Sequence, residues 1–466
     1  MYQKRLTILE KRFQLKSKRN DLSQGSITKQ LTQLTIPMIF GILGIVAFNL
    51  ADTYFVGQLG TEQMAALTFT FPVVLVLNSL NHGIGIGASA IISKAVGEKD
   101  HEKVKRLSTD SLSLGFTFAL IAMIIGQITL HPLFKALGAT DTVMVHVVDY
   151  MRIWYAGVPF IVIPMIGNNA LRALGDTKTA SLVMMVAAGI NILLDPLLIF
   201  GIGILPEMGV SGAATATVIA RFTTFVVSLY ILAAREKVIS IKVIHIRTLL
   251  DSWKKILFIG LPNAISKMVM PIGMGIITGL ISEFGTSAVA GYGIATRIEY
   301  FALSIIAALS SVIPVFVGQN FGAGKMDRIK TALTKSEKFS LVSGIIIALI
   351  FMIGARPISY LFTDSVMVSD TVVIYLKIVP LGYAFYGIIQ IINGTLNALH
   401  KPLRAAIINI VQMLVIYVPL ALVTSSHFGL QGIFISLIVS YFIMAIVSHL
   451  TFNQVFNSLD LENSSK

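Results

Sequence analysis

The sequence predicts an all-α membrane protein of about twelve transmembrane helices, arranged as two six-helix lobes. The chain of 466 residues is 55% hydrophobic and only 13% charged, whereas soluble domains carry about 25% charged residues. Apolar stretches recur along the whole chain, and each is long enough to cross a hydrocarbon core of about 30 Å. The second half also repeats the pattern of the first, which predicts two lobes of equal size.

Hydropathy predicts six helices in each half of the chain. The first six cover 31–57, 64–92, 111–131, 145–170, 179–204 and 211–234, and the second six cover 253–282, 287–317, 337–357, 370–395, 402–425 and 429–453. Several exceed the length that a perpendicular span requires, which fits tilted or bent helices. We therefore expect an N-lobe at 31–234, a linker at 235–252 and a C-lobe at 253–453, with a basic N-terminal arm at 1–30 and a tail at 454–466.

Basic residues indicate the orientation of these spans. Lys and Arg crowd the arm and the segments 94–106, 235–255 and 325–338, whereas the alternate loops contain only Lys135 and Arg356. Because positive loops stay inside, both termini are expected to be cytoplasmic, in a bacterial inner membrane. The same placement explains the net charge of +13 without a nucleic-acid partner. The arm lacks a long apolar core, so we expect it to lie on an anionic leaflet rather than to be a cleavable signal peptide.

The repeat has a register of 225 residues. Pro37 matches Pro262, and Tyr150 matches Tyr375. Each copy contains an even number of spans, so the two lobes should share one orientation and be related by a pseudo-two-fold axis along the membrane normal. Such halves commonly rock around a central cavity and give alternating access. A duplicated scaffold without motion is the alternative interpretation.

Several kinds of site are missing from the sequence. Cysteine is absent, which excludes disulfides and thiolate metal sites. There is no GxxxxGK[ST], HExxH or GxSxG pattern, so neither ATP-driven transport nor an enzyme is indicated. We expect no cofactor beyond a coupling ion. The glycines at 83, 85 and 87 lie inside a hydrophobic span, where close helix packing explains them better than nucleotide binding.

Acidic residues within apolar spans are costly and usually functional. Asp52 lies near the outer end of the first span, and Asp195 lies on the fifth, one turn from Asn191. At about 1.5 Å per residue, these groups and Thr217 of the sixth span fall roughly 8–13 Å below the outer surface. Their hard oxygens suit H+ or Na+. Alternatively, each acid is separately hydrogen-bonded and purely structural.

The repeat provides a control for this hypothesis. Asp52 corresponds to Ile277, and Asp195 falls near Val418, so the C-lobe lacks the acidic pair. This asymmetry favours an ion site in the N-lobe only. Two other charged residues of the C-lobe, Arg297 and Glu299, are more readily interpreted as structural.

A second set of residues is assigned to the substrate cavity or its gating. Soft Met and Phe side chains can line a cavity that accepts varied aromatic molecules. Lys267 lies inside the seventh span, where it could steer substrate, pair across the cavity or extend to the inner surface. Pro37 predicts a bend, either static or linked to the protonation of Asp52. The full set is Pro37, Asn49, Tyr155, Lys267 and Met270.

Four segments resemble the multidrug and toxic compound extrusion (MATE) transporters. They are Asp-Thr-Tyr-Phe-Val-Gly-Gln-Leu-Gly at 52–60, Leu-Arg-Ala-Leu-Gly-Asp at 171–176, Asn-x3-Asp-Pro at 191–196 and Gly-Val-Ser-Gly-Ala-Ala-Thr-Ala-Thr at 209–217. The resemblance covers nearly the whole chain after the arm. It implies twelve helices in two lobes and antiport of organic cations against H+ or Na+.

The resemblance also implies roles for individual residues. In the branch named for a DNA-damage-inducible protein, the ion site falls on Asp52, Asn191, Asp195 and Thr217, and the motif Ala-Ala-x-Ala-Thr prefers Thr217 over Thr215. Other branches carry a Glu on the seventh helix. The comparable position here is near Met270, with Lys267 one turn away, so the sequence departs from that pattern.

These observations predict a secondary active multidrug efflux antiporter that exchanges organic cations for H+ or Na+. We expect it to work as a monomer among membrane lipids. A lipid-linked precursor flippase of related architecture is the alternative, and it would need a cationic cavity for phosphates. An intramembrane enzyme is a third class, for which no nucleophile or metal constellation is present.

Overall fold

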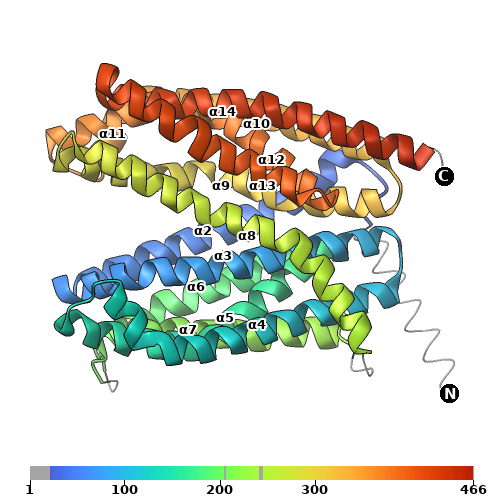
Figure 1. Cartoon of the computed structure of the whole chain (residues 1–466), viewed down its shortest axis with the longest axis horizontal. Helices are drawn as coiled ribbons and strands as arrows, with labels where there is room; N and C mark the ends of the chain where they lie inside the picture. The colour runs from blue at the N-terminus through green and yellow to red at the C-terminus, as the bar shows by residue number, and fades with distance from the viewer. Residues whose placement is uncertain (1–20, 204–205, 241–244, 465–466) are drawn as a thin grey trace.

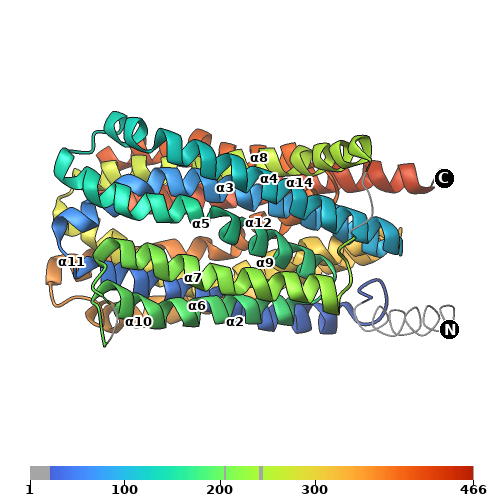
Figure 2. The same ribbon diagram turned by 90° about the horizontal axis from the view of Figure 1, so that it is seen from below.

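The computed structural model describes residues 21–203, 206–240 and 245–464, and these residues form helices and short connections without any strand. Two bundles lie side by side with their helices along the long axis of the molecule (Figures 1 and 2). The first 20 residues of the predicted arm lie outside the described part of the chain. The N-lobe contains α2 (Ile27–Gly57), α3 (Thr61–Gly97), α4 (His101–Ala136), α5 (Asp141–Ala173), α6 (Thr177–Ile199) and α7 (Gly209–Tyr230), with the π-helical η1 (Ile231–Arg235).

The C-lobe begins with three long helices: α8 (Ile246–Ser282), α9 (Thr286–Gly322) and α10 (Met326–Tyr360). Its second part is less regular, with α11 (Val366–Ile378), the 3-10 turn η2 (Val379–Gly382), α12 (Tyr383–Ala398), α13 (Pro402–Ile410), the π-helical η3 (Val411–Tyr417) and α14 (Val418–Ser464).

The number of spans agrees with the prediction of about twelve. Eleven segments of the described chain are long and apolar enough to cross a membrane, and the last of them covers 60 residues, Pro402–Leu461. A continuous helix of that length would measure about 90 Å, roughly three times a hydrocarbon core. The backbone leaves the helical region at Gly429, with φ 58° and ψ −143°. The segment therefore contains two spans joined by a tight reversal.

Several helices are longer than hydropathy predicts because they continue as polar helix beyond the apolar span. α4 begins at His101, where Asp100 caps it by accepting a hydrogen bond from the backbone N–H of Lys103 at 3.0 Å. α8 begins within the predicted linker, and α14 continues through the predicted tail to Ser464. A hydropathy criterion ends each helix where charges begin, although polar helix ends remain stable in water.

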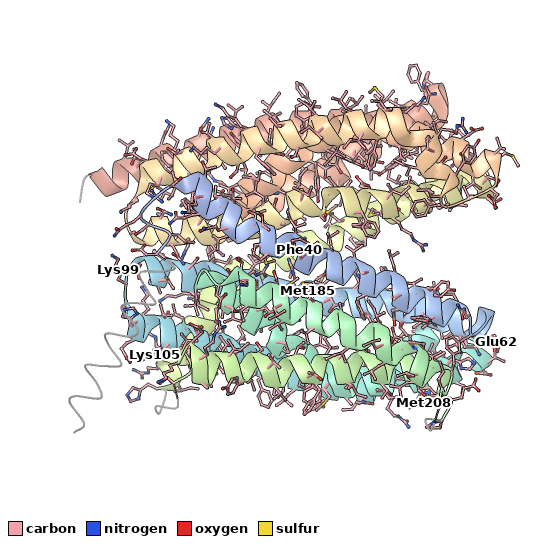
Figure 3. The ribbon with its side chains drawn as sticks, turned by 180° about the vertical axis from the view of Figure 1, so that it is seen from behind. Phe40, Glu62, Lys99, Lys105, Met185 and Met208 are labelled. Carbon is pink, nitrogen blue, oxygen red and sulfur yellow. The ribbon has the colours of Figure 1, made fainter. Side chains whose placement is uncertain are left out.

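The two ends of the molecule differ in charge. Figure 3 shows Lys99 and Lys105 at one end, which we call the basic end, and Glu62 and Met208 at the other, which we call the opposite end. Phe40 and Met185 lie between them on α2 and α6, and both side chains are exposed. Exposed apolar side chains in the middle of a bundle are typical of a surface that contacts lipid.

The lobes approach each other most closely in the half that contains the basic end. A Cβ at Gly87 would lie 2.2 Å from the carbonyl oxygen of Ile256, and one at Gly322 would lie 2.0 Å from that of Lys94. Only glycine permits such backbone contact. In the opposite half, a Cβ at Gly279 or Gly293 would meet no atom within 4 Å. The structure is therefore closed at the basic end, and the two bundles diverge toward the opposite end (Figures 1 and 3).

A short segment before α2 reinforces this closure, and we call residues 21–25 the strap. Arg328 of α10 donates hydrogen bonds to the carbonyl oxygens of Leu22 and Gly25 at 3.0 and 2.8 Å. On the N-lobe side, the Asp21 carboxylate lies 3.7 Å from Lys99 Nζ. Burial opposes ionisation of Asp21, yet the hydrogen bonds from the Ser23 hydroxyl and N–H hold its pKa below the usual value. The strap thus joins the two lobes at the basic end.

Candidate ion site and central cavity

Three of the predicted ion-site residues meet between α6 and α7. Asn191 and Asp195 lie one turn apart on α6, and Thr217 faces them from α7. The Asn191 side-chain amide donates to Asp195 Oδ1 at 3.2 Å and to Thr217 Oγ1 at 3.3 Å. Asp195 is fully buried, and Asn191 and Thr217 are 1% and 9% exposed. The hydroxyl of Thr215 donates instead to the carbonyl oxygen of Ser211, so the structure brings Thr217 and not Thr215 to this cluster.

The cluster has unused acceptors. Asn191 Oδ1 and Asp195 Oδ2 are buried, and neither has a hydrogen-bond partner among the described residues. A buried acceptor without a donor costs about 1–3 kcal/mol, and more when it carries charge. Two such oxygens on one helix face form a position that a proton or a small cation would satisfy.

Asp52 of α2 is the fourth predicted residue and is half-buried. Its carboxylate interacts electrostatically with that of Asp195, and the Tyr150 hydroxyl of α5 lies within the influence of both carboxylates. No described cationic side chain contributes to the environment of either acid. The structure thus gathers α2, α5, α6 and α7 around two uncompensated acids. Sequence analysis missed Tyr150, although its place in the 225-residue repeat marks it.

A small pocket continues from this cluster along α7. It is lined by Asn191 and Thr217 together with apolar residues of α2 and α6, and it reaches Arg221. The Arg221 guanidinium lies 5.6 Å from the centre of the Phe48 ring, which is a cation–π contact. Arg221 is therefore held by an aromatic ring beside the site and forms no ion pair with either acid.

Two predicted gating residues lie on α2. Pro37 is half-buried, and its carbonyl oxygen accepts a hydrogen bond of 2.5 Å from the Ser181 hydroxyl of α6. A Cβ at Gly41 would lie 3.1 Å from the Ser181 backbone, so the two helices cross in close contact here. Asn49 exposes its side chain, while its carbonyl oxygen accepts from Thr53 at 2.8 Å.

The predicted cavity role of Tyr155 needs correction. Its side chain is 2% exposed and lies in the core of the N-lobe, beside Trp154. A Cβ at Gly126 of α4 would lie 2.3 Å from the Tyr155 ring, so the ring occupies the space that this glycine leaves. Large aromatic rings occupy cores as readily as cavities, and sequence alone does not distinguish the two. Met270 is half-buried on α8.

Lys267 belongs to a group that we call the basic cluster, formed by His82, Arg172 and Lys267. His82 of α3 lies within the electrostatic influence of both cations. α3 packs between α8 and α5. On one side it contacts Ala264 of α8, which lies one turn from Lys267. On the other side it contacts Asn169 of α5, whose side-chain oxygen accepts a hydrogen bond from Arg172. No described carboxylate contributes to the environment of Arg172 or Lys267. Sequence analysis missed His82 and Arg172 because they lie on different helices.

Sequence comparison relates this arrangement to known proteins. The MatE family model matches residues 37–197 and 262–423, one match in each lobe. The chain is 36% identical over 433 residues to an FAD transporter of Shewanella oneidensis, covering 92% of this chain and 95% of that one. It is 26% identical to the multidrug export protein MepA of Staphylococcus aureus, with 92% and 94% coverage.

Solved structures agree with the sequence relationship. The Vibrio cholerae MATE transporter VcmN in the bent form superposes with a TM-score of 0.87 at 29% identity, covering 93% of this chain and 98% of that one. An outward-facing multidrug resistance MATE family transporter of the MOP superfamily gives 0.88 at 27% identity, with 94% and 98% coverage. With a family match in each lobe and this agreement over nearly its whole length, the chain belongs to the MatE family of multi-pass MATE transporters.

Proposed function

We propose that this protein is a secondary active efflux antiporter that exchanges drug-like organic molecules for H+ or Na+. The coupling cation binds at Asp52, Asn191, Asp195 and Thr217. The observation that carries this proposal is the pair of buried acceptor oxygens on Asn191 and Asp195 that have no donor among the described residues. Uncompensated carboxylates inside a membrane protein are most simply satisfied by binding a cation.

The position of α2 explains how the ion would affect substrate. α2 carries Asp52 and packs both on α6, which bears the site, and on α9 of the other lobe. A cation bound between Asp52 and Asp195 removes the repulsion that separates the two helices. The resulting shift of α2 against α9 alters the lobe interface, which couples ion binding to release of substrate. α2 also contains Pro37, where a bend is structurally cheap.

We further propose that the basic end is cytoplasmic and that the protein lies in the bacterial inner membrane. Lys99 and Lys105, which belong to one of the basic loops, lie at one end, as the positive-inside rule requires for cytoplasmic loops. In this orientation the structure is outward-open, the state in which a coupling cation enters from outside.

Efflux from proteoliposomes tests the proposal. Ethidium-loaded vesicles should lose the dye faster under a pH gradient or a Na+ gradient, and the effective gradient identifies the coupling ion. Asp195→Asn should abolish the gradient-driven component at equal protein content. Asp149→Asn, which changes an exposed carboxylate on α5, serves as the matched control and should keep it. Wild-type rates in Asp195→Asn and Asp52→Asn would remove the proposed site.

A second candidate function is export of a phosphate-bearing anion. The relative from Shewanella oneidensis is named an FAD transporter, and the basic cluster lacks any described acidic partner. Two uncompensated cations, Arg172 and Lys267, suit an anion better than an organic cation. This candidate uses the same coupling site and differs only in the substrate.

Competition separates the two candidates. If FAD is the substrate, FAD should be exported by wild-type proteoliposomes, and Lys267→Met should reduce that export about tenfold or more, which corresponds to loss of roughly one charge-assisted contact. If organic cations are the substrates, Lys267→Met should leave ethidium export unchanged or raise it. Absence of FAD export by wild-type protein would eliminate the anion candidate.

A further inference from the structure

A half-buried carboxyl group, that of Glu299, lies in the C-lobe, away from the site described above. Glu299 of α9 accepts a hydrogen bond of 2.5 Å at Oε2 from the Tyr375 hydroxyl of α11. Tyr375 is 2% exposed, and Tyr383 of α12 is fully buried. The Tyr383 hydroxyl lies within the electrostatic influence of the same carboxyl and has no hydrogen-bond partner among the described residues. Two phenols from different helices therefore converge on one acid.

No positive charge among the described residues offsets this acid. Arg297 is only two residues away on α9, so its side chain points from a different side of the helix and is exposed. Neutral phenols are the titratable groups that face Glu299 from the surrounding elements, and one of them, Tyr375, donates a hydrogen bond to it. They are Tyr292 and Tyr300 of α9, Tyr375 of α11, Tyr383 and Tyr386 of α12, Tyr417 of η3 and Tyr441 of α14.

Aromatic packing leaves little volume around the carboxyl. The Tyr375 ring lies 5.0 Å from the Phe434 ring and 5.9 Å from the Tyr292 ring, both in edge-to-face geometry. Two phenols and one carboxyl also supply fewer oxygens than the six or more that hard metal ions prefer. A proton needs neither volume nor a full set of oxygens, and it neutralises a charge that is otherwise expensive within the membrane.

The internal repeat connects this group with the N-lobe. Tyr375 is the equivalent of Tyr150 at the 225-residue register, and Tyr150 lies within the influence of Asp52 and Asp195. Each lobe therefore places the same tyrosine beside an acid, although the acids come from non-equivalent helices. The C-lobe positions equivalent to Asp52 and Asp195 are apolar, so comparison of these positions does not identify Glu299.

Irregular helices surround the group. The 3-10 turn η2 (Val379–Gly382) separates Tyr375 from Tyr383, and the π-helical η3 ends at Tyr417. Such interruptions are frequent at hinges and functional sites. The hydrogen bond from Tyr375 to Glu299 thus holds α9 to one side of the break, and the unpartnered hydroxyl of Tyr383 lies on the other side.

We propose that Glu299 is a second proton-binding site, in the C-lobe, whose protonation loosens the attachment of α9 to α11 beside η2. The ionised carboxylate accepts a strong, charge-assisted hydrogen bond from the Tyr375 hydroxyl. One proton from water converts it to a carboxylic acid, which donates one hydrogen bond and accepts more weakly, while both tyrosines keep their protons. Protonation therefore weakens the hydrogen bond from Tyr375 and loosens α9 beside the helix break. The sequence-based interpretation of Glu299 as structural is replaced by this one.

Infrared difference spectroscopy tests the proposal on the full-length protein in lipid, comparing acidic with alkaline pH. Wild type should show the C=O band of buried carboxylic acids. Glu299→Gln should lose one component of that band, and Tyr375→Phe should shift the same component. Tyr230→Phe is the matched control, because Tyr230 is exposed at the end of α7 in the N-lobe and does not face the acid, and it should leave the component unchanged.

The N-lobe variant makes the two sites distinguishable. Asp52→Asn combined with Asp195→Asn should retain the Glu299 component even if those residues prove irrelevant to coupling. If Glu299→Gln does not fold, the shift in Tyr375→Phe carries the test. A spectrum identical to wild type in Glu299→Gln, or in Tyr375→Phe when Glu299→Gln does not fold, would overturn the proposal.

Discussion

The glycine contacts at the basic end predict that one added methyl group shifts a conformational equilibrium. The two states in that equilibrium are the one closed at the basic end and the one open there. In Gly322→Ala, the new Cβ would lie 2.0 Å from the Lys94 carbonyl oxygen, whereas ordinary contact begins at 3.4 Å. The two backbones must therefore separate by about 1.4 Å. Overpacking of this kind typically costs about 1–3 kcal/mol. The contacted atom belongs to the backbone and cannot move away by a change of rotamer. After the gain in helix propensity of alanine is subtracted, we expect the closed state to lose about 1–2 kcal/mol. This corresponds to about a 5–30-fold change in the equilibrium.

Because the sequence contains no cysteine, introduced cysteines can be spin-labelled without background labelling. Spin labels at Lys178→Cys and Lys338→Cys, which change exposed residues at the basic ends of the N-lobe and C-lobe, report the separation of the lobes by double electron–electron resonance. Gly322→Ala should add a population with longer distances. Gly279→Ala, where a Cβ meets no atom within 4 Å, should give the wild-type distribution. An unchanged distribution in folded Gly322→Ala would refute the argument that these contacts hold the closure.

Three further predictions concern the closure and the N-lobe core. Burial and nearby Lys94 lower the pKa of His400 to about 4 from about 6.5 in an unfolded chain. Because the unfolded chain binds the proton first, the free energy of unfolding falls as pH decreases from about 6.5 to about 4, by at most about 3 kcal/mol. His400→Gln should therefore flatten this part of the plot of melting temperature against pH. Arg328→Ala removes the hydrogen bonds to Leu22 and Gly25, so proteolysis within the strap should accelerate, whereas Arg106→Ala should not change it. Tyr155→Ala should lower stability by about 3–5 kcal/mol, as large-to-small core changes do, with efflux per folded protein unchanged; a specific loss of efflux would restore its cavity role.

Much of the fold follows from simple regularities of the sequence. Span count and lobe division depend on apolar length and on the repeat, and both are properties that a linear sequence displays directly. Helix ends were less accurate, as at His101 and Ile246, because polar helix and polar loop look alike to a hydropathy criterion.

The candidate site was predictable where its members lie on one helix or at one depth. Asn191 and Asp195 share a face of α6, and Thr217 was placed by depth and by its motif. Tyr155 shows the limit of this reasoning, because the burial of its ring depends on the space left by Gly126 of another helix. The basic cluster and Glu299 were not assembled for the same reason: each gathers single residues from several helices, and only the packed lobes bring them together.

The most direct test of the coupling site is cation binding to the purified protein, without any transported substrate. Binding of radioactive Na+ and uptake of protons would be measured for wild type, Asp195→Asn and the control Asp149→Asn. The account predicts that Asp195→Asn loses Na+ binding or takes up fewer protons than wild type, while Asp149→Asn behaves as wild type. Equal binding of both cations by wild type and Asp195→Asn would contradict it.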